Sequence, residues 1–132
     1  MSNRFVNWKP PQIKDRVLHD KYYFLIYHKD NLNLGEKTDI GAFTYINAKY
    51  GVVIEDNVQI GSHCSIYSES TIDDKYGKII IKQNAKIGTH STIMPGVVIG
   101  KNAVVGAYSF VNKDIPDNVI AYGVPVKIIK KI

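Results

Sequence analysis

IGTHSTIMPGVVIGKNAVVGAYSFV, residues 87–111, carries an aliphatic residue at every sixth position. The same spacing runs upstream, and every block begins with Leu, Ile or Val. These block starts are Leu34, Ile40, Ile46, Ile54, Ile60, Ile66, Ile81, Ile87, Ile93, Ile99, Val105 and Val111. A short fixed period indicates a solenoid, in which each unit buries its apolar side against its neighbours.

Small or β-branched residues recur at the fifth place of the blocks. They are Thr38, Thr44, Val58, Cys64, Ala85, Ser91, Val97, Ala103 and Ser109. One large and one small apolar residue per block suit a triangular coil with a narrow interior, made of three six-residue blocks per turn. Glycine follows the aliphatic residue in many blocks, and we expect it there because a sharp turn would strain other residues.

An antiparallel barrel or sandwich is the rival fold. It would need longer runs of alternating polarity and hairpin dipeptides such as Asn-Gly, and the sequence has neither. We therefore predict an all-β protein, a parallel β-helix of hexapeptide repeats.

Two departures from the period predict how the chain is organised. Ile46 to Ile54 spans eight residues, and Ile66 to Ile81 spans fifteen, with polar residues between them. We expect an N-terminal cap at 1–31, whose aromatic cluster includes Trp8, and a β-helix at 32–116. We also expect a loop inserted at about 67–78 and a basic tail at 117–132. The cap could form a helix, a strand, or one followed by the other.

Length and composition limit the number of domains and the cellular location that we expect. A chain of 132 residues with 45% hydrophobic content suits one domain. No apolar run reaches the roughly 18 residues that cross a bilayer, and the N-terminus does not resemble a secretory signal. We expect a cytoplasmic protein without membrane partners. Cys64 is the only cysteine, so no intrachain disulfide forms, and no Cys/His cluster has zinc-site spacing.

Charge favours an anionic partner. The formal net charge is +5, from 17 Lys and Arg against 12 Asp and Glu. The lysines are scattered apart from Lys127, Lys130 and Lys131 near the C-terminus. This distribution disfavours nucleic acid and favours a small phosphorylated ligand.

Residues 87–132, IGTHSTIMPGVVIGKNAVVGAYSFVNKDIPDNVIAYGVPVKIIKKI, resemble the carboxyl-terminal signature of the hexapeptide acyltransferases. The similarity is greatest to galactoside, maltose and nucleotide-sugar acetyltransferases, and it covers roughly residues 32–132. It implies a left-handed coil, a homotrimer with active sites between subunits, acetyl-CoA as acyl donor, a sugar acceptor and no metal. The left hand is an exception to the usual crossover rule.

The resemblance also assigns residues to the acyl donor. Backbone groups and one side chain would line the pantetheine groove, and polar and basic side chains would meet the phosphates. Matched by motif, these residues are Thr89 and His90 in IGTHS, Ala107 in VVGAYS, Asn112 and Lys113 in VNKDIP, and Lys127 and Lys130 in VPVKIIKK.

Acyl transfer needs a base for the acceptor's proton, and histidine is the usual choice. His63 and His90 occupy fourth places of their blocks, whereas His19 and His28 lie outside the repeat. His63 directly precedes the inserted loop, where relatives of the resembled family keep their catalytic histidine. We therefore predict His63 as the base.

The inserted loop departs from the family, because it has no histidine. Three explanations stay open: His63 substitutes, an acidic side chain is the base, or an amine acceptor needs little help. Glu69, Asp73 and Asp74 are the candidates for holding the acceptor, since carboxylates accept hydrogen bonds from hydroxyls and amines.

Two other functions use the same coil. A metalloenzyme of the γ-carbonic-anhydrase kind needs three histidines around zinc, and this chain offers only His63 and His90. A non-catalytic scaffold or binding module would explain the missing loop histidine. We favour an acetyl-CoA-dependent acetyltransferase acting on a sugar, in particular a nucleotide-linked sugar destined for a surface polysaccharide.

Overall fold

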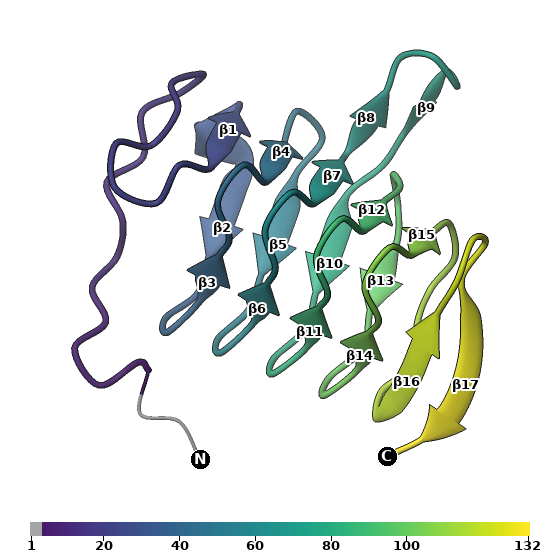
Figure 1. Cartoon of the computed structure of the whole chain (residues 1–132). Helices are drawn as coiled ribbons and strands as arrows, with labels where there is room; N and C mark the ends of the chain where they lie inside the picture. The colour runs from purple at the N-terminus through teal and green to yellow at the C-terminus, as the bar shows by residue number, and fades with distance from the viewer. Residues whose placement is uncertain (1–3) are drawn as a thin grey trace.

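The chain winds into a three-sided coil whose faces are parallel β-sheets (Figure 1). This computed structural model describes residues 4–132. Face A contains β1 (Leu25–Tyr27), β4 (Tyr45–Asn47), β7 (Ser65–Tyr67), β12 (Thr92–Ile93) and β15 (Phe110–Val111). Face B contains β2 (Leu32–Leu34), β5 (Val52–Ile54), β10 (Ile79–Ile81) and β13 (Val98–Ile99). Face C contains β3 (Asp39–Ile40), β6 (Gln59–Ile60), β11 (Lys86–Ile87), β14 (Val104–Val105), β16 (Val119–Tyr122) and β17 (Lys127–Lys131).

The expected all-β parallel β-helix is confirmed. Within residues 4–132 the only helix is the short 3-10 turn η1 (Lys29–Asn31). Antiparallel pairing in this part of the chain is confined to β16 with β17 and to the hairpin of β8 (Glu69–Ser70) and β9 (Lys75–Tyr76). The parallel ladders between coils therefore define the architecture.

Aliphatic block starts form vertical stacks in the interior. On face A, strand pairing aligns the members of one such stack, and each is at most 1% exposed; they are Ile26, Ile46, Ile66, Ile93 and Val111. Burying one such side chain contributes about 2 kcal/mol. The small fifth-place residues are buried between the stacks, as predicted. Their hydroxyls are satisfied by backbone carbonyls, as when Thr44 donates to Gly61 O at 2.8 Å.

The reason for glycine at the second places of the blocks differs from the expected one. They do not adopt positive φ angles, which among glycines occur at Gly51, Gly96 and Gly123. A Cβ atom on Gly41 would instead lie 2.4 Å from the backbone nitrogen of Ser62 on the next coil. The predicted turn strain is therefore wrong, and close approach between coils is what excludes a side chain.

The fourth places carry the left-handed backbone. Between faces B and C these residues are mostly asparagine, which tolerates that conformation well: Asn57, Asn84, Asn102 and Asn118 have φ of 62°, 64°, 61° and 58°. Between faces C and A they are aromatic or imidazole side chains. Because side chains at equivalent positions of successive coils lie above one another, the second corner gathers a row of rings.

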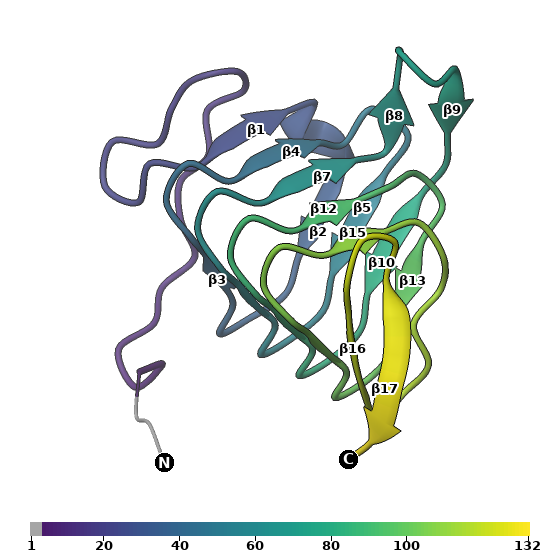
Figure 2. The ribbon, with the colours of Figure 1, turned by 45° about the vertical axis from the view of Figure 1, so that its right-hand side comes forward.

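Extra residues leave the coil at the corner between faces A and B. The eight-residue block turns at Gly51, and the fifteen-residue block forms the hairpin β8–β9, which projects from this corner (Figure 2). In the hairpin Glu69 lies opposite Tyr76 and Ser70 opposite Lys75. The inserted segment thus contains ordered strands.

The first coil begins inside the segment assigned to the cap. Strand β1 pairs with β4, and Phe24 and Ile26 are buried in the same core as the later coils. The boundary at residue 31 therefore falls too late, because η1 occupies the first corner and breaks the six-residue spacing there. The chain before β1 lies at the N-terminal end of the coil (Figure 1), where Ile13 packs against the core. It is anchored by Trp8, whose Nε1 donates to Thr38 O at 2.8 Å.

Among residues 4–132, no helix is both long and apolar enough to cross a membrane.

Candidate active site

A column of stacked rings runs along the corner between faces C and A. It consists of Tyr23, Phe43, His63, His90 and Tyr108, one ring from each coil, and we call it the ring column. All five backbones are left-handed, with φ between 58° and 63°. This conformation turns each side chain outward and over the ring of the neighbouring coil. Only the two histidines are predicted site residues, although the same fourth-place periodicity contains Phe43 and Tyr108.

The two histidines form the tightest part of the ring column. The ring centroids of His63 and His90 are 4.7 Å apart, with 3° between the ring planes. Tyr108 stacks on the other face of His90 at 4.8 Å and 7°. Phe43 contacts the other face of His63 at 5.3 Å with a tilt of 44°. Both imidazole faces are therefore covered, while both residues keep exposed edges.

A hydrogen-bond cluster of two hydroxyls lies beside His90. Oγ1 of Thr89 donates to the carbonyl of Ser62 at 2.7 Å, and it lies 2.9 Å from Nδ1 of His90. Oγ of Ser62 lies 3.1 Å from the same Thr89 oxygen. The structure thus brings together three predicted site residues, His63, Thr89 and His90. Ser62 was missed, because a serine at a third place carries no distinctive sequence signal.

The cofactor candidates Thr89 and Ala107 occupy the same third place on successive coils. Within residues 4–132, their backbone N–H groups donate no hydrogen bond to the protein. Gly88 and Gly106 precede them and have no side chains, so the backbone is open here, and we call it the backbone strip. A shallow depression on face C at this place is lined by residues that include Gly61, Gly88, Gly106 and Ala107. Unpaired donors beside an open backbone strip can bind a ligand carrying amide groups.

Lys127 extends this strip along the coil axis. Strand register aligns Ile87 with Val105 and Val105 with Ala121, and Tyr122, the next residue, lies opposite Lys127. With neighbouring strands about 4.8 Å apart, Lys127 lies about 14 Å along the axis from the Gly88 coil. Lys130 is on the same exposed strand, opposite Ile120. The backbone strip therefore ends at two exposed ammonium groups.

Asn112 and Lys113 lie elsewhere in the protomer. They follow β15 at the corner between faces A and B, and both are exposed. The structure therefore separates them from Thr89 and Ala107 by the width of face A.

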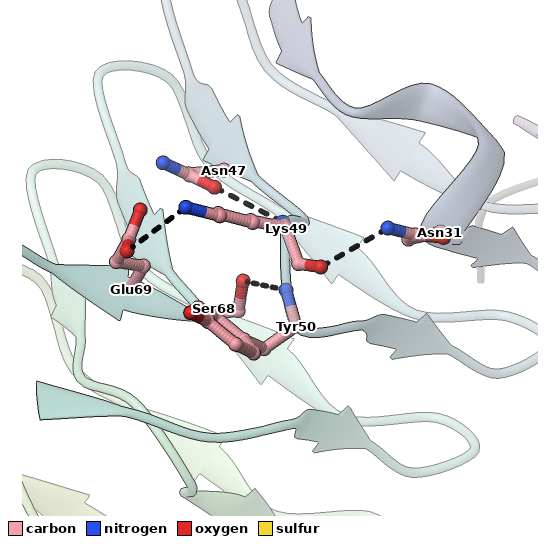
Figure 3. A network of polar contacts seen from close by, with 6 residues as sticks. All are labelled: Asn31, Asn47, Lys49, Tyr50, Ser68 and Glu69. Carbon is pink, nitrogen blue, oxygen red and sulfur yellow. Dashed lines mark hydrogen bonds and ion pairs between the residues drawn. The ribbon is translucent and has the colours of Figure 1, made fainter.

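The acidic candidates also lie at the corner between faces A and B. Glu69 pairs with Lys49, whose Nζ is 3.3 Å away, in a network that includes Asn31, Asn47 and Ser68 (Figure 3). Asp73 and Asp74 are exposed in the hairpin turn. Oδ2 of Asp73 accepts a hydrogen bond from Oγ of Ser70 at 2.9 Å.

His63 and Glu69 lie at opposite ends of β7, so one protomer does not bring the histidines and the carboxylates together. The two groups therefore stand at different corners of the coil, on either side of face A.

Cys64 lies directly beneath His63 but is not a nucleophile of this site. Its side chain is 1% exposed, and Sγ lies 3.3 Å from the carbonyl oxygen of Gly88. Burial raises the pKa of the Cys64 thiol. Among residues 4–132, no group of three or more His, Cys, Asp or Glu residues could hold a metal ion.

Comparison with known proteins agrees with this coil. Residues 78–113 match the family described as bacterial transferase hexapeptide (six repeats). The galactoside O-acetyltransferase of Lactococcus lactis subsp. lactis (strain IL1403) is 35% identical over 113 residues, which cover 74% of this chain and 55% of that protein. The dTDP-3-amino-3,6-dideoxy-α-D-galactopyranose 3-N-acetyltransferase of Aneurinibacillus thermoaerophilus is 47% identical over 55 residues, 42% of this chain and 29% of that protein.

Among solved structures, a galactoside acetyltransferase in complex with coenzyme A superposes with a TM-score of 0.74 and 34% identity. The match covers 83% of this chain and 59% of that one. The chain therefore carries this hexapeptide repeat over residues 78–113 and is similar along most of its length to galactoside acetyltransferases, from the group that its C-terminal signature resembles. The chain spans about half the length of the galactoside acetyltransferases it matches.

Proposed function

We propose that the protein transfers an acetyl group from acetyl-CoA to a hydroxyl or amine of a sugar. The acceptor would be a nucleotide-linked sugar used for a surface polysaccharide. Relatives named for galactoside O-acetylation and for dTDP-amino-sugar N-acetylation support this reaction class. The solved galactoside acetyltransferase with bound coenzyme A supports the donor.

The observation that carries the proposal is the backbone strip that runs from Thr89 past Ala107 to Lys127. Its unpaired N–H groups would bind the amides of the pantetheine arm, and Lys127 with Lys130 would bind phosphate groups of coenzyme A. Asn112 and Lys113 would approach the pyrophosphate from a neighbouring corner. Lys127 lies about 14 Å along the axis from the Gly88 coil, so an extended ligand on the strip would have its phosphate end near the lysines.

The active unit would be a homotrimer, with each active site between two subunits. The separation of the histidines from the acidic hairpin across face A supports this arrangement, because a neighbouring copy could bring its hairpin to the ring column. Exposed rings at the same corner, Phe43 at 56% and Tyr108 at 64%, would be partly covered on assembly.

The hairpin carboxylates would bind the acceptor. Asp73 and Asp74 are exposed, and Glu69 is held by Lys49, so they could accept hydrogen bonds from sugar hydroxyls or an amine. A stacked imidazole would take the acceptor's proton, with His63 the residue that the sequence favours. A backbone N–H of the strip would stabilise the oxyanion that forms at the thioester carbonyl.

Incubating the protein with labelled acetyl-CoA and a panel of amino and hydroxy nucleotide sugars tests the reaction. We expect label on one acceptor class and a stoichiometric release of free thiol. A thermal-shift scan identifies the scaffold alternative, since ligand binding to the native state raises the melting temperature. Absence of both transfer and stabilisation by any CoA ester would favour a scaffold without chemistry.

A further inference from the structure

We propose that Nε2 of His90 is the proton acceptor of the site, held in the required tautomer by Thr89 and Ser62. This assignment deepens the proposed acetyl transfer and rests on it. The tautomer follows from the single hydrogen of the Thr89 hydroxyl and does not depend on the relatives. His90 is also the histidine whose ring is covered on both faces by nearly parallel rings.

The Thr89 hydroxyl has one hydrogen and two lone pairs. Its oxygen lies 2.7 Å from the carbonyl oxygen of Ser62, and two oxygens approach so closely only with a hydrogen between them. A carbonyl has no hydrogen to give, so the Thr89 hydroxyl donates its only hydrogen to Ser62 O. The same oxygen can therefore only accept from its other two neighbours.

Those neighbours are Oγ of Ser62, at 3.1 Å, and Nδ1 of His90, at 2.9 Å. Since Thr89 cannot donate to His90, the hydrogen in the Thr89–His90 contact belongs to Nδ1. Neutral His90 then carries its proton on Nδ1 and a free lone pair on Nε2. A hydrogen bond at one ring nitrogen fixes in this way which nitrogen can act as a base.

His63 has no comparable restraint. Within residues 4–132, no hydrogen bond reaches a ring nitrogen of His63, and its contacts are the rings of Phe43 and His90. The ring column thus gives the two histidines different roles. His90 is oriented by both stacking and a hydrogen bond, whereas His63 forms one wall of the stack.

The proton balance of the reaction fits this arrangement. The acceptor oxygen or nitrogen bonds to the thioester carbonyl carbon while its proton moves to Nε2 of His90, which becomes an imidazolium. The carbon–sulfur bond then breaks, and the Nε2 proton moves to the departing sulfur. The products are the acetylated sugar and free CoA thiol, and His90 returns to its neutral form. Nδ1 keeps its hydrogen bond to Thr89 throughout.

Nitrogen-15 NMR of the histidine rings tests the tautomer without any substrate. In the unmodified protein with a neutral His90 ring, we expect the proton of His90 on Nδ1. Thr89→Ser, which keeps the hydroxyl, should preserve this tautomer. Thr89→Val, which removes the acceptor but keeps the shape, should shift the proton to Nε2. A proton on Nε2 in the unmodified protein, or a Thr89→Val protein without a shift, would overturn the proposal.

Kinetics then test the use of that nitrogen. His90→Asn should lower kcat about a hundredfold or more, because asparagine tolerates the left-handed backbone but cannot accept the proton. His28→Asn is the matched control, at a left-handed histidine outside the ring column, and should keep normal turnover. Near-normal kcat for His90→Asn would overturn the role of His90. Failure of the unmodified protein to acetylate any acceptor would instead contradict the proposed function, whatever tautomer is found.

Discussion

Gly88 and Ala107 lie so close on successive coils that a Cβ atom on Gly88 would be 2.5 Å from the backbone nitrogen of Ala107. This contact lies within the backbone strip, at the place where the acyl donor is proposed to lie. A larger residue cannot be accommodated at Gly88, because the opposing atoms belong to the backbone and cannot rotate away.

Gly88→Ala should therefore destabilise the fold strongly. We expect a loss of about 3 kcal/mol, as for overpacking at a rigid contact, measured by urea unfolding. Gly96→Ala is the matched control, because nothing lies within 4 Å of its Cβ position and only its φ of 81° opposes the change. That control should lose about 1 kcal/mol. Equal losses for the two variants would contradict the close-approach explanation.

His63→Asn should lower kcat by about tenfold, less than His90→Asn. The substitution keeps the left-handed backbone but removes one wall of the ring column, and a ring-stacking contact contributes about 1 kcal/mol. Steady-state kinetics with saturating acetyl-CoA provide the measurement. A hundredfold loss for His63→Asn together with mild effects at His90 would make His63 the base, as the sequence favours.

Lys127→Ala should raise the KM for acetyl-CoA about tenfold and leave kcat nearly unchanged. The reason is the loss of a charge-assisted hydrogen bond to a phosphate at the end of the backbone strip. The effect should shrink when the donor lacks its 3′-phosphate. Lys14→Ala removes another exposed lysine, before the first strand, and should leave KM unaltered. The same KM for the Lys127→Ala and unmodified proteins would remove Lys127 from the donor site.

Asp73→Asn should raise the KM for the sugar several-fold without changing the KM for acetyl-CoA, because a neutral amide is a weaker acceptor than a carboxylate. Asp20→Asn, an exposed aspartate before β1, is the control. Glu69→Gln also breaks the contact with Lys49, so its effect should be compared with Lys49→Met. An unchanged acceptor KM for Asp73→Asn would exclude that carboxylate.

Cys64 should resist alkylation in the native protein. Burial raises the pKa of its thiol. Near pH 8 the folded protein therefore contains less of the reactive thiolate than the unfolded chain does. Mass spectrometry after iodoacetamide treatment should find Cys64 unmodified when native and modified in urea. Because the folded pKa is raised, this group should lower stability only as pH rises above the unfolded pKa. Rapid native labelling would contradict the burial.

Much of the fold follows from local spacing. Each block has the same local pattern. The six-residue period sets the strands, the small fifth-place residues fit the core, and the asparagines at fourth places allow the turns. The position where the coil starts does not follow in this way. Ile26 precedes the first regular six-residue step, from Leu34 to Ile40, so the first coil is recognisable only from the pairing of β1 with β4.

The candidate site followed from the sequence only in part. His63, Thr89 and His90 were chosen from motifs, and they do lie together, but their relation to one another could not be predicted. Ring stacking and the Ser62–Thr89–His90 cluster join residues up to a full coil apart in the chain.

By itself the sequence determined a three-sided coil of hexapeptide repeats, because burial of an aliphatic residue every sixth position is a local requirement that each block satisfies. Only the tertiary structure decided which side chains face one another across coils: the row of rings, the Thr89 hydrogen-bond cluster and the strip that leads to Lys127. The physical reason is that stacking and hydrogen bonding depend on distances of a few ångströms between successive coils, and those distances are set by strand register and by the insertions between blocks.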